Sequence, residues 1–197
     1  MQLHGKIAAM LLFSIALLTS GCGGSSTSGG STPTPTPAPT PTPPPSTTGE
    51  WTWVGGSDTA NAVGVYGTQG IAAASNVPGA RSGSVSWIDG SGNLWLFGGW
   101  GGAGDPAGDL NDLWEFNPSS KEWTWVSGSN TGNTYGAFSE SGVYGTRGVA
   151  SANNVPPPRD SAVSWADSSG NLWLFGGSGY DSTGALVGLN DLWRYQP

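Results

Sequence analysis

Apolar and polar residues alternate in short runs along the chain, and clusters of glycine, proline, asparagine and serine separate the runs. The run LWLF at residues 94–97 is apolar on both faces of an extended chain, which predicts a central strand buried on both sides. In WTWV, at residues 51–54 and 123–126, tryptophan alternates with threonine, which predicts strands with one apolar face. No helical period follows residue 22. The pattern predicts an all-β fold.

The same phrases occur twice, in the same order. SGNLWLFGG stands at residues 91–99 and 169–177, and LNDLW follows at residues 110–114 and 189–193. WTWV and VYGT also recur. A repeat of this fidelity predicts two copies of one structural unit, with insertions confined to loops.

Each unit is expected to contain four short strands. In the first copy these are residues 83–88, 93–97, 112–117 and 122–126, and a Gly-Gly pair ends the second strand. The matching segments of the second copy are residues 160–166, 171–175 and 191–196, and segment 50–54 matches the fourth strand.

The Gly-Gly pair, the NDLW motif and the proline and tryptophan that follow resemble the kelch repeat of β-propellers. The matching residues are Gly98-Gly99, Asp112-Leu113-Trp114, Phe116, Pro118 and Trp123, and then Gly176-Gly177, Asp191-Leu192-Trp193, Tyr195 and Pro197. Arg81 and Arg159, ahead of the first strand, also fit the family pattern. The resemblance covers roughly residues 50–197 and implies kelch-type β-propeller blades. The period departs from the family, at about 78 residues instead of about 50, and tryptophan replaces the usual tyrosine in the third strand.

The N-terminus predicts export and anchoring. Residues 1–22 have the length and apolar centre of a signal peptide, and their end resembles a bacterial lipobox, with Cys22 as the lipidated residue. An ordinary signal peptide with an incidental cysteine is the alternative. Residues 23–49 are rich in Gly/Ser and then in Pro/Thr, which predicts an extended linker. We expect residues 50–197 to be displayed at the bacterial outer membrane or cell surface.

Charge and composition narrow the chemistry. Thirteen carboxylates against six Lys and Arg give a net charge of −7, which argues against nucleic acid and leaves the lipid anchor as the membrane contact. The only histidine is His4 and the only cysteine is Cys22. Galactose oxidase, a related propeller, holds copper with tyrosine, histidine and cysteine. The repeats contain neither histidine nor cysteine, so we expect neither this copper site nor any other cofactor, and no His-dependent nucleophile.

The long connections follow the second and fourth strands, so they should gather at one end of each antiparallel unit. Aromatic loops of this kind suit recognition of carbohydrate or protein. The candidate ligand-binding residues are Trp100, Tyr66, Tyr144, Tyr180, Arg81 and Arg159. The structural alternative is that the arginines pin the following strand and that the loops pack on one another. Asp105 and Asp109 are weak candidates for a calcium site.

The leading functional hypothesis is a surface-anchored, non-catalytic binding or scaffold module. One alternative is a fragment of a larger extracellular enzyme acting on glycans, with its active site outside this chain or in loop carboxylates. Another is a purely structural surface protein. Two repeats give two blades, whereas propellers typically have four to eight. We therefore expect either a fragment of a longer protein or an assembly of several copies, in which three copies give six blades.

Overall fold

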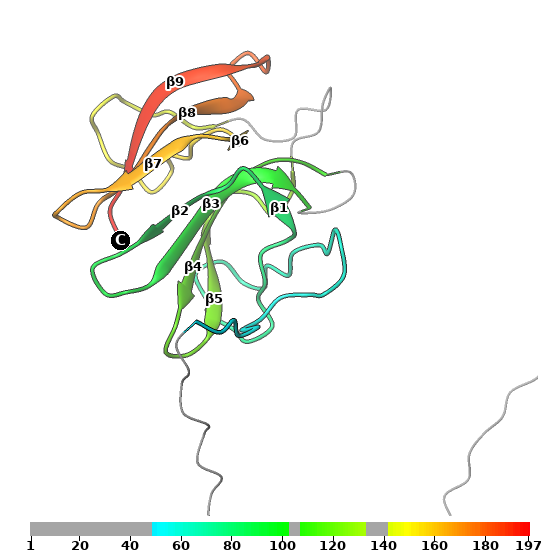
Figure 1. Cartoon of the computed structure of the whole chain (residues 1–197). Helices are drawn as coiled ribbons and strands as arrows, with labels where there is room; N and C mark the ends of the chain where they lie inside the picture. The colour runs from blue at the N-terminus through cyan, green and yellow to red at the C-terminus, as the bar shows by residue number, and fades with distance from the viewer. Residues whose placement is uncertain (1–48, 103–106, 133–141) are drawn as a thin grey trace, which may run out of the picture. The chain divides into compact units, whose positions relative to one another are not determined.

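The structure is a computed structural model that describes residues 49–102, 107–132 and 142–197. Two antiparallel β-sheets make up the unit Glu50–Pro197, which confirms the all-β prediction (Figure 1). The first sheet contains β1 (Arg81–Ser82), β2 (Val85–Ile88), β3 (Leu94–Gly101), β4 (Gly108–Asn117) and β5 (Glu122–Ser127). The second contains β6 (Arg159–Asp160), β7 (Val163–Ala166), β8 (Leu172–Tyr180) and β9 (Leu186–Tyr195). The described residues include no helix with the length and apolar character needed to cross a membrane.

The two sheets share one topology, as the sequence repeat predicts. In the first, β3 is central, with β1 and β2 on one side and β4 on the other, and β5 pairs with β4 at the edge. In the second, β8 is central, between β6 and β7 on one side and β9 on the other. The first sheet thus has one strand more than the second, at the edge that β5 occupies.

The glycine pairs do not end strands, contrary to the prediction. Gly98 and Gly99 adopt φ values of 63° and 96°, and the register between β3 and β4 shifts between Phe97 and Gly99. A Cβ on Gly99 would lie 2.6 Å from the carbonyl oxygen of Ser82, so glycine is required there. The pair forms a bulge, through which the strand continues to Gly101.

Because of this bulge, residues 99–101 and 108–109, expected as part of a long loop, belong to β3 and β4. β8 has the same irregularity, between Phe175 and Gly177, and continues to Tyr180. Trp100, predicted as a loop residue, therefore lies on β3.

The first strand of each unit is shorter than expected, and a separate two-residue strand precedes it. Residues 83–88 were expected as one strand, but Gly83 has a φ of 66° and separates β1 from β2. Ser161 takes the equivalent place between β6 and β7, with a φ of 56°. The amide of Ser161 donates to the carbonyl of Gly83 at 2.8 Å, so the two breaks meet where the sheets touch.

The strand predicted at residues 50–54 does not form. Trp51 is fully exposed and Trp53 largely so, and the segment belongs to neither sheet. A strand needs a partner to satisfy its backbone groups. In Figure 1 the start of the described chain lies below β4 and β5, on the other side of the unit from the edge of β9 that its sequence would match.

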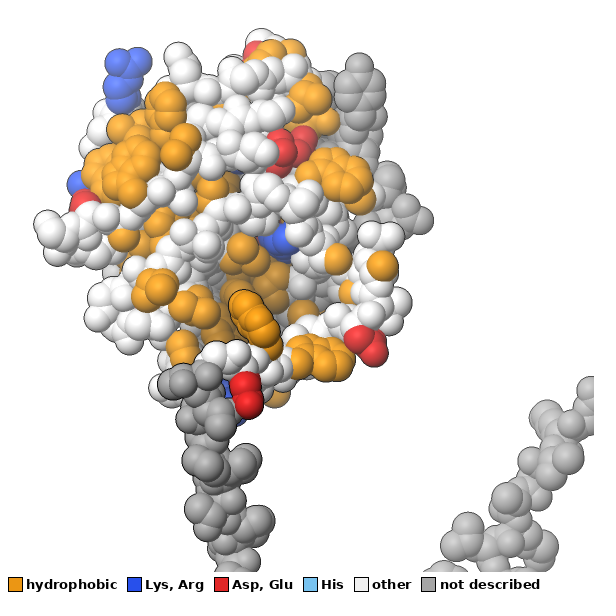
Figure 2. Space-filling model, viewed as in Figure 1, with side chains coloured by type: hydrophobic (Ala, Val, Ile, Leu, Met, Phe, Trp, Pro, Cys, Tyr) orange, Lys and Arg blue, Asp and Glu red, His pale blue; other side chains and the backbone are white. Residues whose placement is uncertain are grey.

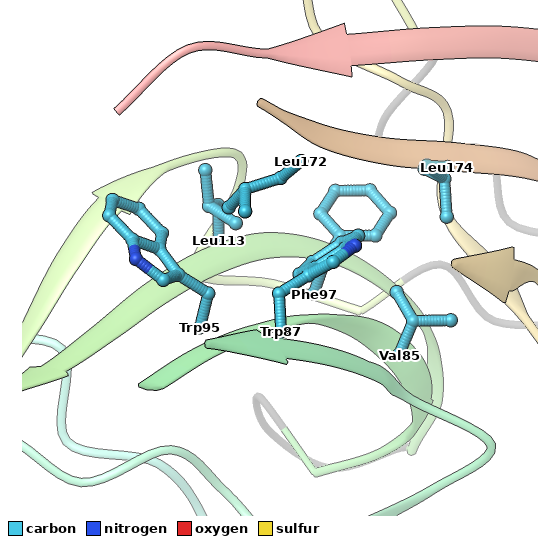
Figure 3. Close-up of a cluster of buried hydrophobic side chains, with 7 residues drawn as sticks. All are labelled: Val85, Trp87, Trp95, Phe97, Leu113, Leu172 and Leu174. Carbon is cyan, nitrogen blue, oxygen red and sulfur yellow. The ribbon is translucent and has the colours of Figure 1, made fainter. Parts of the chain in front are cut away.

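The core lies between the sheets. Trp87, Phe97 and Leu113 point from the first sheet toward Leu172 and Leu174 of β8 (Figure 3). The indole nitrogen of Trp87 donates to the carbonyl of Trp173 at 3.1 Å. Among the described residues, each sheet packs one of its faces against the other sheet.

The prediction that LWLF is buried on both faces is therefore only half correct. Trp95 and Phe97 are buried, whereas Leu94 is exposed and Leu96 is half-buried. The described residues provide no second sheet against that face.

Candidate functional site

A buried carboxylate joins the strands of the first repeat. Arg81 forms a bidentate ion pair with Asp112 of β4, with both nitrogen–oxygen distances at 2.7 Å. The Tyr66 hydroxyl and the Trp114 indole each donate to the same carboxylate at 2.7 Å. These donors compensate for burying the charge. The cluster ties the segment before β1 to β4.

The second repeat builds the same cluster. Arg159 pairs with Asp191 at 2.6 and 2.7 Å, and Tyr144 and Trp193 donate to that carboxylate at 2.9 and 2.7 Å. The side chain of Asp112 is completely buried, whereas that of Asp191 keeps 15% of its exposure. The second cluster is therefore the more open one.

These environments shift the pKa values of Asp191 and of both tyrosines. Burial raises the pKa of Asp191, but the hydrogen bonds from Arg159 and Trp193 and the charge of Arg159 outweigh it and lower the pKa to about 2. Burial, the hydrogen bond to Asp191 and the charge of that carboxylate raise the pKa of Tyr144 to about 12. The pKa of Tyr66 is raised further, by burial and then by the charge of Asp112. The second cluster is thus built around an ionised aspartate, and both clusters hold a neutral tyrosine.

Four of the six predicted ligand-binding residues belong to these clusters. Tyr66, Arg81 and Arg159 are buried or nearly so, and Arg81 and Arg159 also donate to the carbonyls of Gly98 and Gly176. This geometry favours the structural alternative, in which the arginines hold the strand and the segment ahead of it. Tyr144 and its cluster are partly accessible. Tyr180, a fifth candidate, is buried at the end of β8.

The segment Asp89–Asn93, which reads Asp-Gly-Ser-Gly-Asn, forms the turn between β2 and β3. The Asp89 carboxylate accepts hydrogen bonds from the amides of Ser91 and Asn93, at 2.8 and 3.0 Å, and from the indole of Trp95. Asp167 does the same in the second repeat. Each aspartate closes its hairpin and positions the following tryptophan.

Asp109 lies opposite Trp100 and within electrostatic reach of Asp160, and we call these three residues the junction site. Trp100 and Asp109 lie opposite one another in the β3–β4 pair, so their side chains share one face of the sheet. A Cβ added at Gly83 would lie 3.2 Å from the Asp160 side chain, at the point where the two sheets meet. Trp100 keeps 53% of its exposure, whereas Asp109 is buried. The sixth predicted residue, Trp100, is the more exposed of the two candidate aromatic residues that remain open, the other being Tyr144.

The environment of Asp109 shifts its pKa. Burial, and then the negative charge of Asp160, raise the pKa of Asp109 to about 6. The position of Asp160 in the second repeat is that of Ser82 in the first, and serine carries no such charge. Sequence reasoning singled out Trp100 and Asp109 but missed Asp160, because only the docking of the sheets brings Asp160 close.

The calcium prediction has no structural test. Asp105 lies outside the described residues. Within the described ranges, no three histidine, cysteine, aspartate or glutamate side chains are grouped so that they could hold a metal ion. Cys22, the predicted lipidation site, also lies outside them.

An apolar cleft of about 440 Å³ opens between the sheets. The sequence assigned its walls to the core, and only the packing of two twisted sheets leaves this space. Its apolar lining is Trp87, Phe97, Leu113, Leu172, Leu174, Trp193 and Tyr195, and Ser127, Asn154, Arg194 and Gln196 are among its polar residues.

The chain was compared with models of protein families and with curated proteins. No family model matches it, and no curated protein does. The candidate sites therefore rest on the repeat and on the geometry.

Proposed function

We propose that this chain is a surface-anchored, non-catalytic binding and scaffold module, built from kelch-type β-propeller blades, that recognises carbohydrate or protein. The blade interpretation is supported by the ordered motifs and by their roles. In both sheets the Gly-Gly bulge, the arginine and the aspartate of NDLW meet in one cluster. A repeated frame of this kind leaves the loops and strand ends free to carry binding residues.

The junction site is the observation that carries the binding proposal. It combines the half-exposed ring of Trp100 with two carboxylates, Asp109 and Asp160. An aromatic ring packs against the apolar face of a sugar, while carboxylates accept hydrogen bonds from its hydroxyls. The chain carries a net charge of −7, so the ligand is expected to be neutral or cationic.

The anchor belongs to the same proposal. A lipid on Cys22 followed by the Pro/Thr-rich linker would hold the sheets away from the membrane. Replacing Cys22 with serine should release the protein into the soluble fraction of cells that produce it. Retention of the Cys22→Ser protein in the membrane fraction would contradict the anchor.

One observation favours the alternative of an enzyme acting on glycans. Asp109 has a pKa of about 6, and a carboxyl group of that kind is suited to act as a general acid. The two roles are separable, because Asp109→Asn abolishes acid catalysis but keeps a hydrogen-bonding side chain for binding.

The experiment is a glycan array probed with the whole chain carrying Cys22→Ser, followed by product analysis of every glycan that binds. Binding without cleavage supports the module. Cleavage that disappears in Asp109→Asn would establish the enzyme. If the array and a screen of surface proteins give no ligand at the junction site, the proposal is wrong.

A further inference from the structure

Within the chain, the two sheets contact each other through two different kinds of face. The face of the first sheet that carries Trp87, Phe97 and Leu113 packs against Leu172 and Leu174 of the second. Both sheets have the same sequence motifs, so each has both kinds of face. Only one face of each is used within the chain.

The unused face of the second sheet is open. Trp165 and Leu192 take the positions of Trp87 and Leu113, yet Trp165 is 45% exposed against 8%, and Leu192 is 54% exposed against 5%. Val163 and Phe175, on the same face, are also exposed. In Figure 2 a hydrophobic patch lies over the part of the surface that β7 occupies.

The unused face of the first sheet is its counterpart. Leu94 and Leu96 take the positions of the buried Leu172 and Leu174, but Leu94 is exposed and Leu96 is half-buried. The first sheet of one copy can therefore meet the second sheet of another in the way that the sheets meet within a chain. Such a contact is head to tail and leaves a free face at each end.

The edge strand β9 of the second sheet corresponds to β4 of the first sheet, which pairs with β5. In the first sheet, β5 is held between β4 and the segment ahead of β1. The amides of Gly70 and Ala73 donate to the carbonyls of Trp125 and Trp123, and Tyr66 packs edge-on against Trp125 with ring centroids 5.2 Å apart.

In the second sheet the corresponding space is a groove of about 930 Å³. Residues 144–150 line one side, and residues 190–194 of β9 line the other. No described strand pairs with the outer edge of β9. The groove is thus the place that β5 fills in the first sheet.

The chain carries a segment that matches this groove. Residues 50–54 read EWTWV, and residues 122–126, which make up most of β5, read EWTWV as well. Trp123 and Trp125 are packed in the first sheet, whereas Trp51 is fully exposed and Trp53 is 68% exposed. Large apolar patches of this kind mark interaction surfaces, and each tryptophan that becomes buried removes about 150–250 Å² from water.

We propose that a second copy of this chain docks on the second sheet and inserts its residues 50–54 into the groove beside β9. One copy supplies both contacts, because residues 50–54 lead into the first sheet just as β5 leads into the second. By analogy with the β4–β5 register, Trp53 faces Trp193, Thr52 faces Arg194 and Trp51 faces Tyr195. Repetition of the contact closes a ring, and three copies supply six sheets.

Cysteine cross-linking of whole chains tests the register. In a Cys22→Ser background, Thr52→Cys protein is mixed with Arg194→Cys protein and oxidised. The expected product is a disulfide-linked pair of chains, which forms faster than with Gln196→Cys, two residues out of register. The chain offers a matched internal control, because Glu115 and Thr124 are partners in β4–β5 and their cysteine variants should link within one chain.

Sedimentation of the Cys22→Ser chain supplies a test that does not depend on the engineered cysteines. A trimer is expected, and the double variant W51S/W53S should sediment as a monomer with an unchanged near-ultraviolet spectrum apart from the two lost indoles. Val63→Ser, a change at another exposed apolar residue, should leave the trimer intact. A monomeric parent chain, or no link between Thr52→Cys and Arg194→Cys, would each overturn the proposal.

Discussion

Arg81 and Asp112 lie 31 residues apart and form a buried bidentate ion pair, with both contacts at 2.7 Å. The same carboxylate accepts hydrogen bonds from Tyr66 and Trp114. One side chain therefore joins three parts of the repeat. Arg159 and Asp191 reproduce the arrangement in a more open setting.

Replacing Asp112 with asparagine should destabilise the protein strongly. It would leave the Arg81 guanidinium buried without its counter-charge, and removal of one partner of a buried pair typically costs about 3–5 kcal/mol. Asp191→Asn should cost less, because its carboxylate is partly exposed. Urea unfolding measures both, with the exposed Asp58→Asn as the control. Equal losses in all three variants would contradict the assigned role of the pair.

Acid should weaken the second cluster within a defined pH range. The pKa of Asp191 is about 2 in the folded chain and about 3.9 in an unfolded one. The folded state therefore favours the ionised form, and this contribution is present above pH 4 and disappears as the pH falls toward 2. The free energy of unfolding of the parent chain should fall more steeply over that range than that of Asp191→Asn. Parallel curves would show that Asp191 does not contribute.

Exchanging the residues at the two strand breaks should have opposite effects. Ser161 has a φ of 56°, which costs a side-chain-bearing residue about 1–2 kcal/mol, while Gly83 adopts a similar φ without that cost. Ser161→Gly should therefore raise the free energy of unfolding by roughly 0.5–1 kcal/mol, because the greater entropy of glycine in the unfolded chain offsets part of the relieved strain. Gly83→Ser should lower it, and its new Cβ would lie 3.2 Å from Asp160. Thermal unfolding of the two variants measures the signs, which must differ.

Asp109→Asn should stabilise the protein at neutral pH. The pKa of Asp109 is raised to about 6 by burial and by Asp160, so the folded chain disfavours the ionised carboxylate. A shift of about two pKa units corresponds to roughly 3 kcal/mol, which is the largest gain expected above pH 6. The gain should shrink as the pH falls from 6 to 4, where the parent residue becomes protonated in both states. A gain that is independent of pH would contradict the assigned environment.

Much of the fold could be predicted from the sequence because the same strand and turn motifs occur twice in the same order. The continuous apolar run at residues 94–97, repeated at residues 172–175, identified the central strands, and the turn residues located the hairpins. The glycine pair was misread as an end, since glycine is favoured in bulges as well as in turns. The segment 50–54 was misread as a formed strand, because pattern alone does not say whether a partner edge is within reach.

Some residues of the candidate sites could also be predicted from the sequence, and one could not. Arg81 and Arg159 recur in register, and that regularity pointed to the structural role that the ion pairs now favour. Trp100 stood out because it has no counterpart in the second repeat, where Ser178 takes its place. Asp160 could not be found, because its closeness to Asp109 depends on how the sheets dock.

The most direct test of the binding proposal is the affinity of a glycan or protein ligand, once identified, for the whole chain with and without Trp100. Trp100→Ala should weaken binding at least tenfold, while Ile88→Ala, at another exposed apolar residue of the first sheet, should leave it unchanged. Both variants should unfold as the parent does, since neither side chain is buried. Full affinity in the Trp100→Ala chain would contradict the junction site and the function proposed for it.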